Sequence, residues 1–182
     1  MTSSENRNAL ILLLWEHLGI PVIPADEVQP ETEFPYAFYS VINPGGGLPG
    51  MGNVKQESRE SEDPAFPTDV ISVMQDMPVA TFSLTFCSVT REEKFTQNQI
   101  IGDDEAMSLA QKARDYLVHG GYYQLDAAGL VTVDTTEPTR RGSLVVDSFD
   151  SRYGFDVRIR CAHDIERNEA SIENLNYTRK ES

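Results

Sequence analysis

Cysteine, cationic side chains and long hydrophobic runs are all scarce in this chain of 182 residues. The two cysteines, Cys87 and Cys161, are too few for a disulfide framework, and they lack the Cys-x-x-Cys spacing of zinc and redox sites. We therefore expect both to be free thiols.

The hydrophobic runs are too short to span a membrane. The longest, Ala9 to Trp15, falls far below the ~20 residues that a membrane helix needs, and the start MTSSENRN lacks the basic region that precedes a secretory signal. We expect a soluble protein that is not secreted. With 40 % hydrophobic and 24 % charged residues, the composition is that of a globular chain large enough to bury the core of one domain.

The shortage of cations makes the chain strongly acidic, with a net charge of −14. Residues 1–139 hold 7 Lys or Arg and 21 Asp or Glu, whereas residues 140–182 hold 8 of each. Nucleic-acid affinity comes mostly from cations that displace counterions from phosphates. The composition therefore disfavours a protein that grips DNA or an anionic membrane, and favours one that repels DNA or imitates it.

The first half of the chain predicts one helix and three strands. Hydrophobic residues at helical spacing, from Leu10 to Leu18, predict an amphipathic helix that ends at Gly19. Phe34 to Ile42 is rich in aromatic and β-branched residues, which indicates a strand buried on both faces. Asp69 to Gln75 is a candidate short strand, and Val79 to Val89 alternates strictly between hydrophobic and polar residues, as a strand with one packed face does.

The second half predicts one helix and four strands. Asp103 or Asp104 is a candidate cap for a helix with an apolar stripe that closes at Gly120-Gly121. The strands that we expect beyond it, joined by short polar turns, are Leu130 to Asp134, Leu144 to Asp150, Tyr153 to His163 and Ile172 to Tyr177. The order predicts an α+β fold in which residues 1–182 form a single domain, a curved antiparallel sheet with two main helices packed on it.

The glycine-rich stretch PGGGLPGMGNVKQESRESEDP, residues 44–64, raises the question of a phosphate cradle. It lacks the Gly-Lys-Ser/Thr of a P-loop and the strand and helix that flank a dinucleotide fingerprint. Its charged half has no apolar periodicity. We therefore expect a long inserted loop or arm at about 44–68, which is either disordered or used for binding.

We find no catalytic, cofactor or metal site in the sequence. Cys161 and His163 fall on one face of the predicted strand, but Cys161 follows hydrophobic residues on that face, so we interpret it as a buried structural cysteine. His17 and His119 have no partner at metal-ligand spacing, and we expect interfacial or capping roles. Arg158 and Arg160 lie opposite the apolar face, either as a solvent-facing, ion-paired row or as part of a subunit interface.

Two stretches resemble the phage neck or tail terminator proteins. The first runs from Trp15 through Ala25 (WEHLGIPVIPA) and continues with PYAFYSVI at residues 35–42, and the second is RYGFDVRIR at residues 152–160, with Ile172-Glu173 beyond it. The similarity covers about two thirds of the chain and lies in residues that build the fold. Residues 44–64 are outside it.

The resemblance implies a structural virion protein of the tail or neck, assembled in the host cytoplasm. It implies a ring, typically a hexamer, that ends the tail tube, contacts the tube and, where the tail has one, a sheath protein, and receives the head connector. DNA would pass through without specific binding, since an acidic lumen does not hold phosphates. The loop would then be an assembly arm, and our interface candidates are Leu48, Met51, Val54, Arg158 and Arg160.

Two other classes remain open on the sequence alone. An acidic DNA mimic, or another protein-binding module, would be a monomer or dimer that binds basic DNA-binding proteins. A small cytosolic enzyme would need a pocket with perturbed titratable groups.

Overall fold

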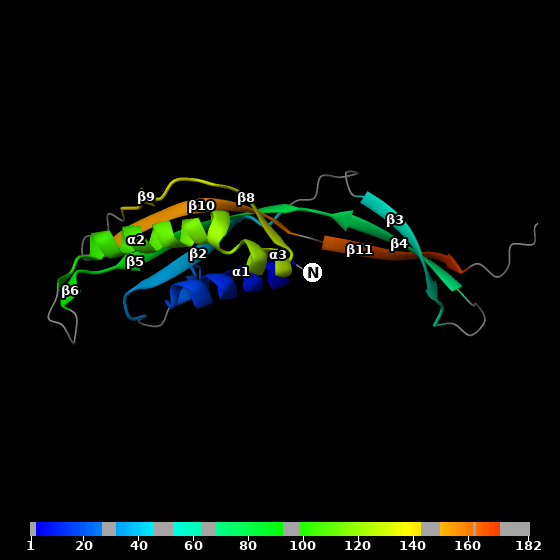
Figure 1. The fold of residues 1–182 in the computed structure, drawn as a ribbon, viewed down its shortest axis with the longest axis horizontal. Coiled ribbons are helices and arrows are strands. Elements are labelled where there is room, and N and C mark those ends of the chain that lie inside the picture. Colours follow the sequence, from blue (N-terminus) through cyan, green and yellow to red (C-terminus); the bar gives the residue numbers. More distant parts are fainter. Residues whose placement is uncertain are drawn as a thin grey trace, which may run out of the picture. The chain divides into compact units, whose positions relative to one another are not determined.

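The structure is a computed structural model that describes residues 3–26, 32–45, 53–62, 68–92, 99–142, 150–161 and 163–171. Contacts divide the chain into two compact units, and Figure 1 shows the elements of each. Unit 1 comprises Met1–Gly46 and Pro78–Cys161, and unit 2 comprises Gly47–Met77 and Ala162–Ser182. Helices together with mainly antiparallel sheets confirm the α+β class. That residues 1–182 behave as one domain stays a prediction.

Unit 1 is built on a six-stranded sheet in the order β1-β2-β5-β10-β8, with β9 pairing β10 beside β8. The strands are β1 (Val22–Pro24), β2 (Tyr36–Asn43), β5 (Val79–Ser88), β8 (Leu130–Thr135), β9 (Thr139–Arg140) and β10 (Ser151–Cys161). Every pair is antiparallel except β1 with β2. A separate short hairpin joins β6 (Arg91–Glu92) to β7 (Gln99–Ile100).

Helices bury one face of this sheet. They are α1 (Ser3–Leu18), α2 (Gly102–Asp115), a π-helical turn η1 (Tyr116–Gly120) and α3 (Tyr122–Ala127). Leu10 and Leu14 of α1 join Leu84 of β5 and Phe155 of β10 in one core in which all four are fully buried. Among the described residues, no helix is long and apolar enough to cross a bilayer.

The packed face predicted for residues 79–89 is confirmed, because Ala80, Phe82, Leu84 and Phe86 are all buried on the helix side. The opposite face is less open than predicted, since Thr85 and Cys87 are buried as well. The prediction that Phe34 to Ile42 is buried on both faces is wrong. In β2 only Ala37 and Tyr39 are buried, and Val41 and Ile42 at its end are 38 % and 58 % exposed. Aromatic and β-branched composition indicated a strand correctly and overestimated its burial.

The predicted cap of the second helix is also wrong. α2 begins at Gly102 after Ile101, which makes no side-chain capping bond, and the Gly102 N–H donates instead to Thr90 Oγ1 at 3.1 Å. Asp103 accepts a hydrogen bond from the Tyr153 hydroxyl at 3.1 Å. A cap supplied by Thr90, in the loop between β5 and β6, therefore replaces the local one.

Unit 2 is a three-stranded antiparallel sheet in the order β11-β4-β3. Its strands are β3 (Asn53–Glu60), β4 (Thr68–Asp76) and β11 (His163–Ser171), and we call it the arm sheet. β4 confirms the strand predicted at Asp69 to Gln75. β3 corrects the prediction of a structureless segment at 44–64, since all eight of its residues pair with β4.

The last predicted strands are confirmed in part. Leu130 to Asp134 lies in β8. The strand predicted from Tyr153 to His163 is divided, with Tyr153 to Cys161 in β10 and His163 at the start of β11. Of the remaining two, Leu144 to Asp150 lies outside the described residues except for Asp150, and Ile172 to Tyr177 lies wholly outside them.

Candidate assembly surfaces

The residues proposed for a subunit interface fall in different places. Leu48 and Met51 lie outside the described residues. Val54 lies on β3 and is 58 % exposed. Arg158 and Arg160 are exposed on β10, on the sheet face opposite the helices, and Arg158 Nη1 donates to Asp134 Oδ2 of β8 at 3.0 Å. The structure therefore puts Val54 in unit 2 and the two arginines in unit 1.

The open face of the unit 1 sheet carries a polar clasp centred on Arg141. Its guanidinium donates to Asp156 Oδ1 at 2.7 Å, to Thr85 Oγ1 at 3.0 Å and to Ser83. Partial burial of Asp156 opposes its ionisation, but the hydrogen bonds from Arg141 and Ser83 outweigh this and lower the pKa of its carboxyl. Arg141 passes over Gly154, where a Cβ would lie 2.7 Å from its Nε.

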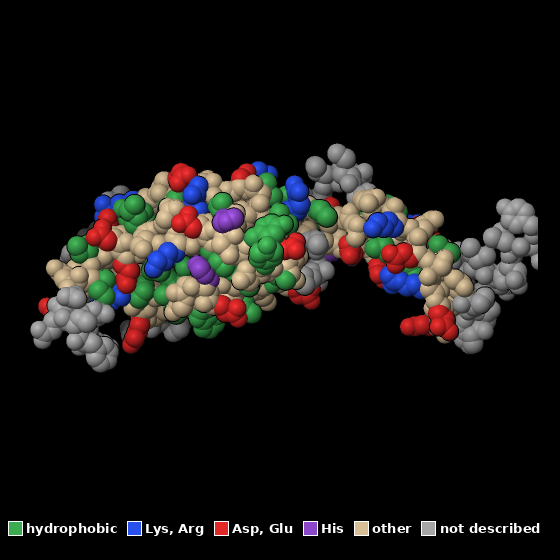
Figure 2. Space-filling model, viewed as in Figure 1, with side chains coloured by type: hydrophobic (Ala, Val, Ile, Leu, Met, Phe, Trp, Pro, Cys, Tyr) green, Lys and Arg blue, Asp and Glu red, His purple; other side chains and the backbone are tan. Residues whose placement is uncertain are grey.

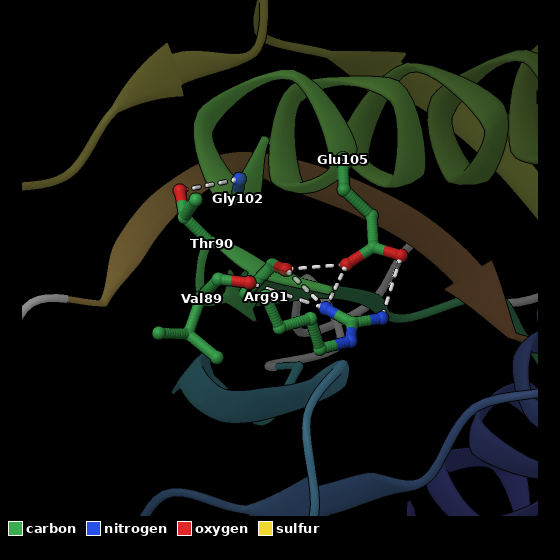
Figure 3. Close-up of polar contacts among 6 residues, drawn as sticks. Val89, Thr90, Arg91, Gly102 and Glu105 are labelled. Carbon is green, nitrogen blue, oxygen red and sulfur yellow. Dashed lines mark hydrogen bonds and ion pairs between the residues drawn. The ribbon is translucent and has the colours of Figure 1, made fainter. Parts of the chain in front are cut away.

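A second clasp joins the end of β5 to the first turn of α2 (Figure 3). Arg91 Nη1 and Nη2 donate to the two oxygens of Glu105 at 2.7 and 3.0 Å, and the buried Ser88 hydroxyl donates to the same carboxylate. Burial opposes ionisation of Glu105, yet these hydrogen bonds hold the pKa of its carboxyl below its usual range. A Cβ on Gly102 would lie 2.7 Å from the Thr90 backbone nitrogen, so only glycine allows this approach.

Sequence analysis missed both clasps, because each joins residues that are far apart along the chain and on different elements. The Arg91 and Glu105 side chains are 29 % and 24 % exposed, and those of Arg141 and Asp156 are 30 % and 39 % exposed. The carboxylate of each clasp, Glu105 in one and Asp156 in the other, is paired with an arginine and has a lowered pKa. These are the properties of structural pairs, since a general acid would need a raised pKa.

The cysteines are packed thiols. Burial raises the pKa of Cys87 to about 11 and that of Tyr36, its hydrogen-bonding neighbour, to about 12. Cys161 is 5 % exposed, and burial raises its pKa as well, which supports its interpretation as a structural cysteine. A thiol with a raised pKa is a poor nucleophile and metal ligand. Within the part of the chain that the structure describes, no three His, Cys, Asp or Glu side chains are grouped to hold a metal.

Exposed hydrophobic side chains occur on each helical element of unit 1: Leu12 and Trp15 of α1, Val118 of η1, and Tyr122 and Tyr123 of α3, with exposed fractions from 53 % to 82 %. Figure 2 shows hydrophobic groups on this side of the unit, with polar and charged side chains between them. Beside Val118 is a hollow lined by His17, Lys112, Asp115, Tyr116, Val118, His119 and Gly120. The His17 ring stacks on Tyr116, with 4.1 Å between ring centroids. The interfacial roles predicted for His17 and His119 stay predictions.

The arm sheet has very little core. Among its described residues only Val73 of β4 is buried, and every residue of β3 is exposed. The strand register places Val54 opposite Met74 and Met74 opposite Ile165, so these three side chains form one row across the sheet. We call them the apolar row. Val54 and Ile165 are 58 % and 42 % exposed.

Comparison with known proteins identifies a family. A family model described as phage neck terminator protein matches residues 8–179, which is nearly the whole chain. No curated protein matches the sequence.

Proposed function

The chain belongs to the phage neck terminator family, and from this premise we propose that it forms a closed ring at the head-proximal end of a phage tail. There it ends growth of the tail tube and receives the head–tail connector. Its neighbours would be further copies of itself, the tube, the sheath protein where the tail has one, and the connector. The family is structural, and the proposed role needs neither catalysis nor a cofactor.

The observation that best supports assembly is the thin core of the arm sheet. Isolated small sheets are marginally stable in water unless a hydrophobic face packs against something. The arm sheet has one buried residue among those described and keeps Val54 and Ile165 exposed. A partner that covers the apolar row would supply the missing burial.

The charge supports passage of DNA without binding. The chain has a net charge of −14, and its exposed carboxylates repel the phosphates of DNA. The DNA-mimic alternative makes a different prediction, a monomer or dimer that binds basic DNA-binding proteins. The carboxyls of Glu105, Asp156 and Glu166 have a lowered pKa, whereas an enzyme's general acid needs a raised one.

Electron microscopy tests the proposal directly. We expect rings in the purified protein or, if assembly needs the tube, density for this chain at the head-proximal end of tails from infected cells. A strain that lacks the protein should accumulate tails of irregular length that do not join heads. Virions that contain no copy of the chain, or normal tails in its absence, would overturn the proposal.

A further inference from the structure

We propose that the Met77-Pro78 step is a hinge about which the arm sheet changes its orientation relative to unit 1. The chain passes between the two units at this peptide bond, and it passes again directly after Cys161. The inference concerns a single copy of the chain, so it goes beyond the proposed ring and does not depend on it.

The two strands that pass between the units keep one register. In unit 1 the pairing of β10 with β5 reaches Arg160 opposite Val79, and in unit 2 the pairing of β11 with β4 starts at His163 opposite Asp76. Each strand advances by three residues between these pairs, from 160 to 163 on one and from 76 to 79 on the other, so neither carries an inserted residue. A complete set of hydrogen bonds at this step would therefore join both units in one continuous ladder.

Pro78 interrupts that ladder. The Cys161 N–H donates to the Pro78 carbonyl oxygen at 3.0 Å. Two residues that face each other in this way in an antiparallel pair normally exchange two hydrogen bonds, but proline has no N–H to donate in return. On the arm side, the Met77 N–H donates to Asp76 Oδ1 at 2.8 Å, which is a contact with its own neighbour and not with another strand. One hydrogen bond remains where a regular ladder has two.

No third strand supports this step within the described part of the chain. β2 makes its last pair with β5 at Asn43 opposite Thr81, and β3 makes its first pair with β4 at Asn53 opposite Gln75. Positions 76–80 lie between these two pairs, and their ladder partners are on β10 and β11 alone. Two-stranded ribbons twist more than wider sheets, and a lone pair of strands is only marginally stable in water.

The surroundings of Pro78 offer little resistance to movement. Met77 is 58 % exposed, so no core holds its side chain. Gly45, with φ of 92°, lies beside Pro78, and a Cβ added to it would be 3.3 Å from Pro78 Cβ. The third connection between the units joins Gly46 to Gly47, and glycine has no Cβ to restrict its dihedral angles.

A hinge at this place separates two parts of different stability. Hinges are a few residues at the ends of elements that absorb a change in backbone dihedral angles, and Met77 and Pro78 lie between the end of β4 and the start of β5. The arm sheet, with its thin core, can then change orientation when it meets a partner, while the packed core of unit 1 stays intact.

Distances between spin labels on the full chain test the hinge. Labels at Ser58→Cys in β3 and Ser108→Cys in α2 report on the separation of the two units. Two control pairs report within one unit, Ser108→Cys with Gln124→Cys in unit 1 and Ser58→Cys with Asn168→Cys in unit 2. All four sites are exposed, and the native cysteines are buried, so they should take no label.

We expect a broader distribution of distances between the units than in either control pair, because a hinge adds movement that neither unit has by itself. Equal widths in the three pairs would overturn the hinge. A unit 2 control as broad as the pair between the units would place the movement inside the arm sheet, which also overturns it.

Substitution of Pro78 assigns the movement to this residue. Pro78→Val supplies the missing N–H to the Cys161 carbonyl and a side chain that favours strands, so the distribution between the units should narrow towards the width of the controls. Pro138→Val, in the turn between β8 and β9, is the matched control and should leave the width unchanged. No narrowing in Pro78→Val, or the same narrowing in both variants, would reject Pro78 as the hinge.

Hydrogen exchange gives a readout that needs no change at the hinge. The Cys161 N–H should exchange faster than the N–H of Ile159, two residues earlier in β10, because movement at the hinge breaks the single bond to Pro78. Exchange at Cys161 as slow as at Ile159 would contradict the hinge. All of these measurements use the unassembled chain, so their failure leaves the proposed function standing, and the absence of rings leaves the hinge standing.

Discussion

Replacement of Glu105 by glutamine tests whether the clasp between β5 and α2 stabilises unit 1. The amide keeps the shape of the side chain and one acceptor oxygen. It removes the negative charge of the carboxylate, to which Arg91 and Ser88 together donate three hydrogen bonds. Ser88 is fully buried, so a weakened partner there is costly.

The expected loss follows from the contacts and their exposure. Hydrogen bonds to charged groups stabilise by about 1.5–3 kcal/mol each when they are shielded. Arg91 and Glu105 are 29 % and 24 % exposed, so water screens part of the interaction, and glutamine retains part of the bonding. We expect a loss of about 2 kcal/mol in the free energy of unfolding, which corresponds to a fall in Tm of about 4 to 8 °C for a chain of this size.

Thermal and urea unfolding followed by circular dichroism measure this loss, with Asp104→Asn as the matched control. Asp104 lies in the same helical turn and is exposed, so its replacement removes the same charge but only a helix-dipole interaction, about 0.5 kcal/mol. Equal shifts in Tm for the two variants would refute the reasoning, because the effect would then come from charge near the helix start and not from the clasp.

The pH dependence gives a second check with a definite sign. The pKa of Glu105 in the folded chain lies below its ordinary value of 4.5, so its contribution to stability is present above that value and is lost as pH falls through the lowered pKa. The difference in stability between wild type and Glu105→Gln should therefore be largest near neutral pH and shrink below pH 4.5. A difference that stays constant with acidification would contradict the lowered pKa.

Three further predictions concern packing and local stability. Gly154→Ala should destabilise by more than about 2 kcal/mol in urea unfolding, because its Cβ would lie 2.4 Å from the Leu84 carbonyl oxygen, whereas Gly142→Ala, with open space around it, should change stability little. Leu14→Ala, in the core, should cost about 2–5 kcal/mol, and Leu12→Ala, at a site 53 % exposed, less than about 1 kcal/mol; similar losses would contradict the assigned helix face. In unassembled protein, amides of β3, β4 and β11 should exchange hydrogen faster than those of β5 and β10, as the thin core of the arm sheet implies; equal protection would support a single domain instead.

Local periodicity predicted the central elements of unit 1. The alternation along β5 and the apolar stripe of α2 both depend on residues a few positions apart, and burial of Phe82, Leu84, Leu109 and Ala113 confirms the face that each predicted. The prediction of the helix cap was less reliable. Asp103 was expected to cap α2 because of its position near the helix start, but its carboxylate instead accepts a hydrogen bond from Tyr153 and pairs with Arg140, which lie on β10 and β9.

The Arg141 and Arg91 clasps had no local signal at all. The Arg141 clasp depends on which strand lies beside which, and the Arg91 clasp depends on where the first turn of α2 packs against the end of β5. The sequence alone supplied neither arrangement. The exposed aromatic pair Tyr122-Tyr123 was visible directly after Gly120-Gly121, yet exposure cannot be inferred from identity, since aromatic residues are more often packed. The family resemblance identified the class of protein but none of its surfaces.

The arm sheet shows why a strand can be taken for a loop. Asn53–Glu60 contains one large hydrophobic residue, Val54, because β3 pairs through its backbone with β4, which supplies the hydrophobic side chains. Register alone decides which face of the sheet each side chain of such a strand lies on. A slip of one residue would turn Val54 to the face that carries the Arg59–Glu166 ion pair. Arg59 and Glu166 are too exposed for their ion pair to add much stability. Their two parallel hydrogen bonds, however, would be lost if β3 shifted by one residue against β4. The ion pair therefore specifies which face of the arm sheet carries the apolar row.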